Sequence, residues 1–300
     1  MEHSHVTANA APLAPAERAR WLQRATRASV ATAVLLILVK LVAWLLTGAL
    51  SILASLIDSL MDALASLVNL LAVRWSLQPA DAEHRFGHGK AEPLAGLAQA
   101  AFIAGSAVFL VLHALERLRQ PQRLEATAVG IGVMLFAMFA TLLLLWLQRR
   151  VIRLTGSSAI RADALHYASD LLANLGVIAA LVLAGRGVQI ADPLFALLVA
   201  GYIFVSAGRI TRAALEQLMD RELPEAVQKR ILEAARRPAA VRGVHALRTR
   251  QAGPVPFVQL HLELDGDLPL REAHAIADEV DAAIRQLLPG AEVIIHQDPV

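Results

Sequence analysis

The chain has 300 residues, of which 56% are hydrophobic and 18% charged, and its mean hydropathy is +0.52. This composition is too apolar for an ordinary soluble protein, so the sequence indicates a membrane protein. The formal net charge is only +2 and the basic residues lie at the ends of apolar segments, which argues against a nucleic-acid partner despite a pI near 9.4. Because cysteine is absent, disulfides and thiolate metal sites are excluded, and any metal must have nitrogen or oxygen ligands.

Apolar segments long enough to cross a hydrocarbon core, which takes about 20 helical residues, recur through the first two thirds of the chain. We predict six membrane spans at 29–47, 49–73, 94–115, 126–147, 159–184 and 193–210. The start of the chain lacks the short apolar core and cleavage site of a signal peptide, so it is predicted to be a mobile tail. The expected domains are a tail at 1–25, a six-helix transmembrane domain at 26–215 and a soluble domain at 216–300.

Lysine and arginine predict the orientation of these spans, because they concentrate on the cytoplasmic side of a membrane. The side that contains both termini has Arg18, Arg20, Arg24, Arg27, Arg74, Arg85, Lys90, Arg149, Arg150, Arg153, Arg161, Arg209 and Arg212. The opposite side has only Arg117, Arg119, Arg123 and Arg186. We therefore expect a multi-pass protein with both termini in the cytoplasm.

The second predicted span contains two carboxylates, although each ionised residue at mid-membrane costs roughly 2.5–3.5 kcal/mol on insertion scales. Apart from Ser59, the polar residues of this span recur at steps of three or four and so share one helical face: Ser51, Ser55, Asp58, Asp62, Ser66 and Asn69. Asp58 and Asp62 are one turn apart on this face, so both can bind the same ion.

The fifth predicted span has a second polar face, formed by Asp163, His166, Asp170 and Asn174. Two such faces are expected to meet, since a polar face turned toward lipid would lack hydrogen-bond partners. Asp58, Asp62, His166 and Asp170 would then supply three carboxylates and one imidazole, which suits the tetrahedral shell of zinc.

Two other interpretations of these buried carboxylates stay open. They can form a structural polar network with Lys40 of the first span as counter-ion, or they can relay protons without a metal. Two separate pairs of metal-ligand residues, each one turn apart, favour a metal site over both.

The soluble domain is predicted to have the order α-β-β-α-β, with helices at 224–237 and 270–288 and strands at 241–250, 255–265 and 291–296. In the second strand, Val258, Leu260 and Leu262 alternate with polar residues that include His261. This period of two predicts a strand with one buried and one exposed face.

Several segments of the sequence together resemble a known family. They are SILASLIDSLMDALASLVNLLAVRWSLQPADAEHRFGHGKAEPLAGLAQ, ALHYASDLLAN, HALRTRQAG and IIHQDP. In these segments the chain closely resembles bacterial members of the cation diffusion facilitator family, of the zinc and ferrous-iron efflux type. The resemblance implies that Asp58, Asp62, His166 and Asp170 form the intramembrane transport site.

The resemblance also implies metal sites outside the membrane. The loop after the second span contains Asp81, His84 and His88, which alone could be merely solvated but which match the positions of a second ion site. In the soluble domain, the residues that match a binuclear zinc site are His245, His261, His274, His296 and Asp298. That domain would be metallochaperone-like in fold, and relatives dimerise through it.

The expected function is proton-coupled export of a divalent cation, Zn²⁺ or else Cd²⁺ or Fe²⁺, by alternating access from a homodimer in the inner membrane. Metal binding requires neutral His166 and ionised carboxylates, so protons compete with the metal. The imidazole favours these ions over manganese or magnesium. An intramembrane metalloprotease is disfavoured because no HExxH motif occurs. A membrane-bound metal sensor would not need ligands at mid-bilayer.

Overall fold

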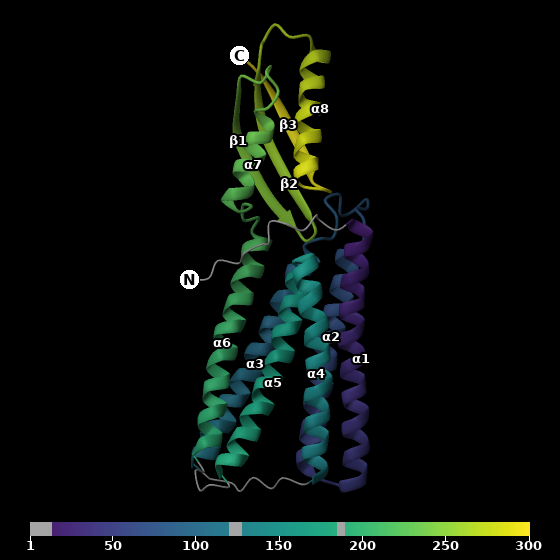
Figure 1. Ribbon diagram of the computed structural model, residues 1–300, viewed down its shortest axis with the longest axis vertical. Helices are drawn as coiled ribbons and strands as arrows, with labels where there is room; N and C mark the ends of the chain where they lie inside the picture. Colours follow the sequence, from purple (N-terminus) through teal and green to yellow (C-terminus); the bar gives the residue numbers. More distant parts are fainter. Residues whose placement is uncertain (1–13, 120–127, 185–189) are drawn as a thin grey trace. The chain divides into compact units, whose positions relative to one another are not determined.

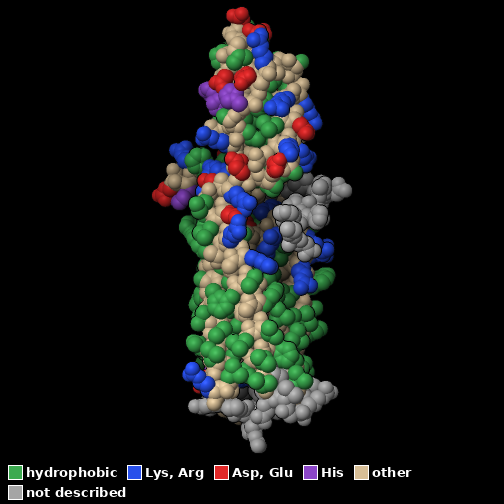
Figure 2. Space-filling model, turned by 90° about the vertical axis from the view of Figure 1, so that its left-hand side faces the viewer, with side chains coloured by type: hydrophobic (Ala, Val, Ile, Leu, Met, Phe, Trp, Pro, Cys, Tyr) green, Lys and Arg blue, Asp and Glu red, His purple; other side chains and the backbone are tan. Residues whose placement is uncertain are grey.

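The computed structural model describes residues 14–119, 128–184 and 190–300. Within these residues, each predicted span corresponds to one long helix of a bundle (Figure 1): α1 Pro15–Thr47, α2 Leu50–Ser76, α3 Ala91–Arg119, α4 Ala128–Thr155, α5 Ser158–Ala184 and α6 Ala191–Leu218. Among the described residues, α1 to α4 and α6 are long and apolar enough to cross a membrane. Helix α5 packs against α3, α4 and α6. Figure 2 shows hydrophobic side chains covering this helical part of the chain.

Several helices extend beyond the predicted spans, because hydropathy marks only the part of a helix that lies in hydrocarbon. Helix α1 begins at Pro15, inside the segment that was predicted to be a tail. Proline is favoured at the first position of a helix, and the alanine, glutamate and arginine that follow are good helix formers. The earlier part of the predicted tail, residues 1–13, lies outside the described residues.

A tight turn joins α4 to α5 and fixes where α5 starts. Gly156 has a φ of +65°, a left-handed conformation that glycine adopts without steric cost. Its N–H donates to the Ile152 carbonyl at 2.8 Å, and α5 begins two residues later at Ser158. The Ser158 N–H in turn donates to Glu92 Oε1 of α3 at 2.9 Å, which satisfies a free backbone donor in the first turn of α5.

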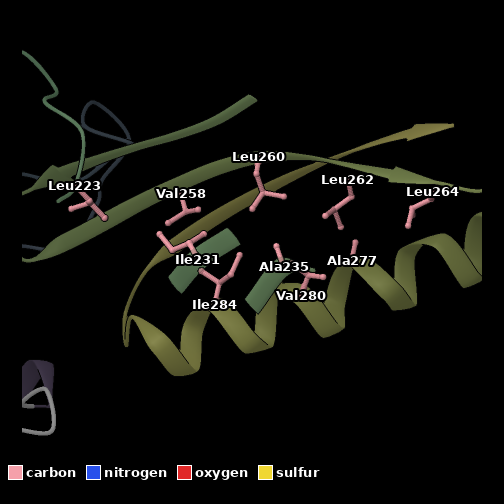
Figure 3. Close-up of a cluster of buried hydrophobic side chains, with 10 residues drawn as sticks. All are labelled: Leu223, Ile231, Ala235, Val258, Leu260, Leu262, Leu264, Ala277, Val280 and Ile284. Carbon is pink, nitrogen blue, oxygen red and sulfur yellow. The ribbon is translucent and has the colours of Figure 1, made fainter. Parts of the chain in front are cut away.

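The soluble domain contains α7 Glu225–Ala235, β1 Gly243–Ala252, β2 Val255–Leu264, α8 Leu270–Leu287 and β3 Glu292–Pro299. The sheet order is β1-β2-β3, with β1 antiparallel and β3 parallel to β2. The two helices pack on one face of this sheet around a hydrophobic core (Figure 3) made of Leu223, Ile231, Ala235, Val258, Leu260, Leu262, Leu264, Ala277, Val280 and Ile284. The alternate residues of β2, which include His261, therefore lie on the opposite, open face.

The predicted fold class, an all-α transmembrane domain followed by a small α-β-β-α-β domain, is confirmed. Contacts between residues separate a helical unit, Trp21–Leu218, from a unit that contains Met219–Val300.

Candidate metal sites

The polar faces of α2 and α5 meet inside the helical unit. Asp62 Oδ1 lies 3.0 Å from His166 Nε2, and Asp170 Oδ2 lies 3.7 Å from the same nitrogen. One ligand atom from each of these residues falls within 4.8 Å of the other two, so the three can hold one ion. His166 is buried, and Asp170 Oδ2 is a buried oxygen without a hydrogen-bond partner among the residues that the structure describes. A buried carboxylate oxygen left in this way is suited to a cation.

The three side chains differ in exposure. The His166 side chain is 5% exposed, whereas those of Asp62 and Asp170 are 23% and 39% exposed. The imidazole is therefore enclosed by protein, whereas each carboxylate keeps some exposed surface.

Asp58 is not among the three residues that the structure gathers at this point. It lies one turn before Asp62 on α2, and its side chain is exposed. The helical spacing that aligns the two carboxylates is as expected, but alignment along one helix does not require both to turn toward α5.

The loop between α2 and α3 brings Asp81, His84 and His88 within ligand distance of one another. Asp81 Oδ2 lies 3.3 Å from His88 Nε2, and Asp81 Oδ1 lies 3.4 Å from His84 Nδ1. The two imidazole rings are 4.5 Å apart, and Trp75, near the end of α2, packs against both. This tryptophan has no ligand atom, so a search for metal ligands in the sequence overlooks it.

Backbone N–H groups stabilise the ionised form of the Asp81 carboxyl. The N–H groups of Glu83 and His84 donate to its Oδ1 at 3.0 and 2.6 Å. The bond from His84 is the main reason that the pKa of the Asp81 carboxyl lies below its usual range.

The register of the sheet explains the third cluster. His245 on β1 is paired with His261 on β2, which is paired with His296 on β3, so the three imidazoles form a row across the open face. Asp298 lies two residues further along β3 and so shares that face. Figure 2 shows histidine side chains gathered beside acidic ones on this domain.

Asp298 is the common partner of this row. Its Oδ2 lies 2.8 Å from His261 Nδ1 and 3.3 Å from His245 Nε2, and its Oδ1 lies 3.2 Å from His296 Nε2. His245, His261 and Asp298 offer ligand atoms within 4.8 Å of one another. The pKa of the Asp298 carboxyl lies below its usual range. The hydrogen bond from His261 is the largest cause, and the nearby imidazoles are a further one.

Within this one chain, the predicted ligand His274 lies outside the cluster, and its role as a ligand stays a prediction. It lies on α8, which covers the opposite face of the sheet, and its Nε2 is 3.6 Å from Asp278 one turn further on. Glu263, which was not predicted, does reach the cluster, because its Oε1 lies 2.9 Å from His245 Nδ1. The alternation along β2 already placed Glu263 on the same face as His261, which is the signal that could have identified it.

Comparisons with known proteins cover both parts of the chain. Residues 26–219 match the family model of the cation efflux transmembrane domain, and residues 223–300 match that of the cytoplasmic domain of cation efflux proteins. The cation-efflux pump FieF of Pectobacterium atrosepticum is 53% identical over 282 residues, which are 94% of each chain. The cation-efflux pump FieF of Serratia proteamaculans is 51% identical over 281 residues, again 94% of each chain.

Among solved structures, a variant of the MamM CTD in its nickel form is 33% identical. The match covers 26% of this chain and 99% of the MamM chain, with a TM-score of 0.25.

Proposed function

Because this chain belongs to the cation diffusion facilitator family of membrane transporters, we propose that it exports Zn²⁺ from the cytoplasm in exchange for protons. The observation that carries the proposal is the meeting of Asp62, His166 and Asp170 between two helices of the bundle. One nitrogen and several carboxylate oxygens suit Zn²⁺, and the same set would accept Cd²⁺ or Fe²⁺.

We further propose that Asp58 completes the shell during transport. A small rotation of α2 would turn Asp58 toward the ion that Asp62 is proposed to bind, since the two are one helical turn apart. Alternating access would then consist of exposing this site first to the cytoplasm and then to the other side.

Proton coupling follows from the ligands themselves. An imidazole binds metal only when neutral, and a carboxylate only when ionised, so loading displaces protons and protonation favours release. Protons would thus return to the cytoplasm as metal leaves it.

Purified protein in liposomes, with a zinc indicator and a pH indicator inside, tests the exchange directly. We expect zinc entry to be accompanied by acidification of the outside medium and alkalinisation of the lumen, and to stop when the protein is omitted. Zinc flux without any proton movement would exclude antiport. Repeating the assay with cadmium, ferrous iron and manganese ranks the substrates, and manganese is expected to be the poorest.

The remaining clusters are proposed to bind Zn²⁺ as regulatory sites, one in the loop at Asp81, His84 and His88 and one in the soluble domain. The protein is proposed to act as a homodimer, joined through the soluble domain and membrane helices, in the bacterial inner membrane with cytoplasmic termini. The match of residues 223–300 to the cytoplasmic-domain model and the arginine distribution support this arrangement. Filling the soluble-domain site would stiffen the dimer and raise the transport rate.

Zinc binding to the soluble-domain cluster is expected to weaken as the pH falls below neutral, because protons compete with the metal for the imidazole nitrogens. Asp298 does not contribute to this change. A carboxyl whose pKa is lowered by folding stabilises the native state above its unfolded pKa of about 3.9, and loses that effect only as the pH falls through the lower folded value.

Calorimetric titration of zinc into the protein at a series of pH values measures this dependence. An Asp298→Asn variant is expected to bind zinc more weakly at every pH, because it lacks one ligand, and to keep the loss of affinity on acidification, because the imidazoles remain. Affinity that is unchanged on mild acidification and is lost only in the acidic range of carboxyl groups would instead make Asp298 the titrating group.

A further inference from the structure

Asp163 on α5 is a carboxylate with no exposed surface, three residues before His166. Three helices donate hydrogen bonds to it. Gln99 Nε2 of α3 reaches its Oδ1 at 2.9 Å, while Ser29 Oγ of α1 and Gln148 Nε2 of α4 reach its Oδ2 at 2.6 and 2.7 Å. Both carboxylate oxygens are therefore engaged by protein donors.

The next turn of α5 is held in the same way. The buried Tyr167 hydroxyl lies 2.9 Å from Ser66 Oγ of α2 and donates to the Ser29 carbonyl of α1 at 3.3 Å. His166 thus lies between two positions at which α5 is bonded to its neighbours. With these bonds on either side, His166 places its Nε2 3.0 Å from Asp62 Oδ1.

A carboxylate suits this position better than an amide. Its two oxygens accept from all three donors at once, whereas an asparagine has a single acceptor oxygen and would turn an N–H group toward one of them. Since unpaired polar groups are costly when buried, the carboxylate fixes the relative positions of α1, α3, α4 and α5 more strictly.

We propose that Asp163 is a positioning residue for transport, which sets the rotation and depth of α5 so that His166 faces Asp62. It binds no metal in this role. The inference rests on the proposed function of His166 and Asp62 as metal ligands, and it adds a fixed support that the ligand pairs alone do not provide.

The Asp163→Asn variant tests this role in zinc transport by proteoliposomes. Its KM for zinc is expected to rise about 10–100-fold, the usual effect of losing a residue that orients a metal ligand. The kcat per folded molecule is expected to change much less, because all ligands remain present. Exchanging the two groups in a Gln148→Glu, Asp163→Asn double variant restores one carboxylate to the network and is expected to recover much of the KM.

Ser169→Ala is the matched control. Ser169 is also buried on α5, but its hydroxyl donates only within its own helix, to the Leu165 carbonyl at 2.8 Å. The KM of the Ser169→Ala variant for zinc is expected to stay at the wild-type value. If Asp163→Asn does not fold, Ser29→Ala removes a single donor and is expected to raise the KM in the same direction by a smaller factor.

Thermal unfolding, measured alongside, separates the outcomes. A lower unfolding temperature with an unchanged KM would make Asp163 a purely structural residue and overturn the inference. If Asp62→Ala transports normally, the proposed metal site itself is wrong. If Asp62→Ala fails while Asp163→Asn keeps the wild-type KM, only the inference about Asp163 is wrong.

Discussion

The Asp62→Ala variant is expected to lose zinc transport by more than about a hundredfold. Replacing a residue that merely orients a metal ligand costs about 10–100-fold, and Asp62 is proposed to be a ligand itself. The substitution would also leave His166 without the carboxylate that lies 3.0 Å from its Nε2. Both changes weaken the site without removing any large buried side chain.

Initial rates of zinc uptake into proteoliposomes, normalised to the amount of reconstituted protein, measure this loss. Glu116→Ala is the matched control, because it also removes a carboxylate from a membrane helix. Glu116 lies on α3, is exposed and contacts His113 at 3.7 Å, outside the α2–α5 cluster. Equal loss in both variants would point to a general effect of charge removal, and normal transport by Asp62→Ala would refute the assigned site.

Leu260→Ala is expected to destabilise the soluble domain by about 2–5 kcal/mol, the range found when a buried leucine is truncated. Leu260 has no exposed surface and lies in the middle of β2, where it contacts the core formed with α7 and α8. A loss of this size is a large fraction of the stability of a small domain. The histidine row on the other face of the same strand should become less ordered.

Hydrogen exchange of the β2 amides, followed by mass spectrometry on the full chain, reports the opening free energy of this region. Gln259→Ala changes the neighbouring residue, whose side chain is exposed, and is expected to leave exchange nearly unaltered. Identical protection in the two variants would show that the core in Figure 3 does not limit the stability of the domain.

The spacing of hydrophobic residues predicted most of the fold, because burying one face of a helix or strand imposes that spacing on the sequence. Each apolar segment became one helix, and the alternation of Leu260 and Leu262 with His261 gave the buried and open faces of β2. The facing of α2 and α5 was also predicted, since polar residues in hydrocarbon must find one another. These inferences depend on local spacing, which the sequence contains directly.

Other features depend on how separate segments meet, and spacing does not contain that information. The row of His245, His261 and His296 comes from strand register, which is set by turns and by the core. His274 was grouped with them by resemblance, and within one chain α8 places it on the other side of the sheet, so that assignment stays a prediction. The three donors to Asp163 come from helices distant in sequence, so its polar face alone could not identify them.

The histidine row has a consequence for how the soluble domain would respond to its surroundings. An ion bound by His245, His261 and Asp298 would cross-link all three strands and close loops along most of the domain, much as a disulfide does, but reversibly. Its stabilising effect grows with the logarithm of free metal, reaching about 2.7 kcal/mol at a hundred times Kd. The stability of the domain would therefore rise by a similar increment for each tenfold rise in free zinc, over a wide range of zinc concentrations.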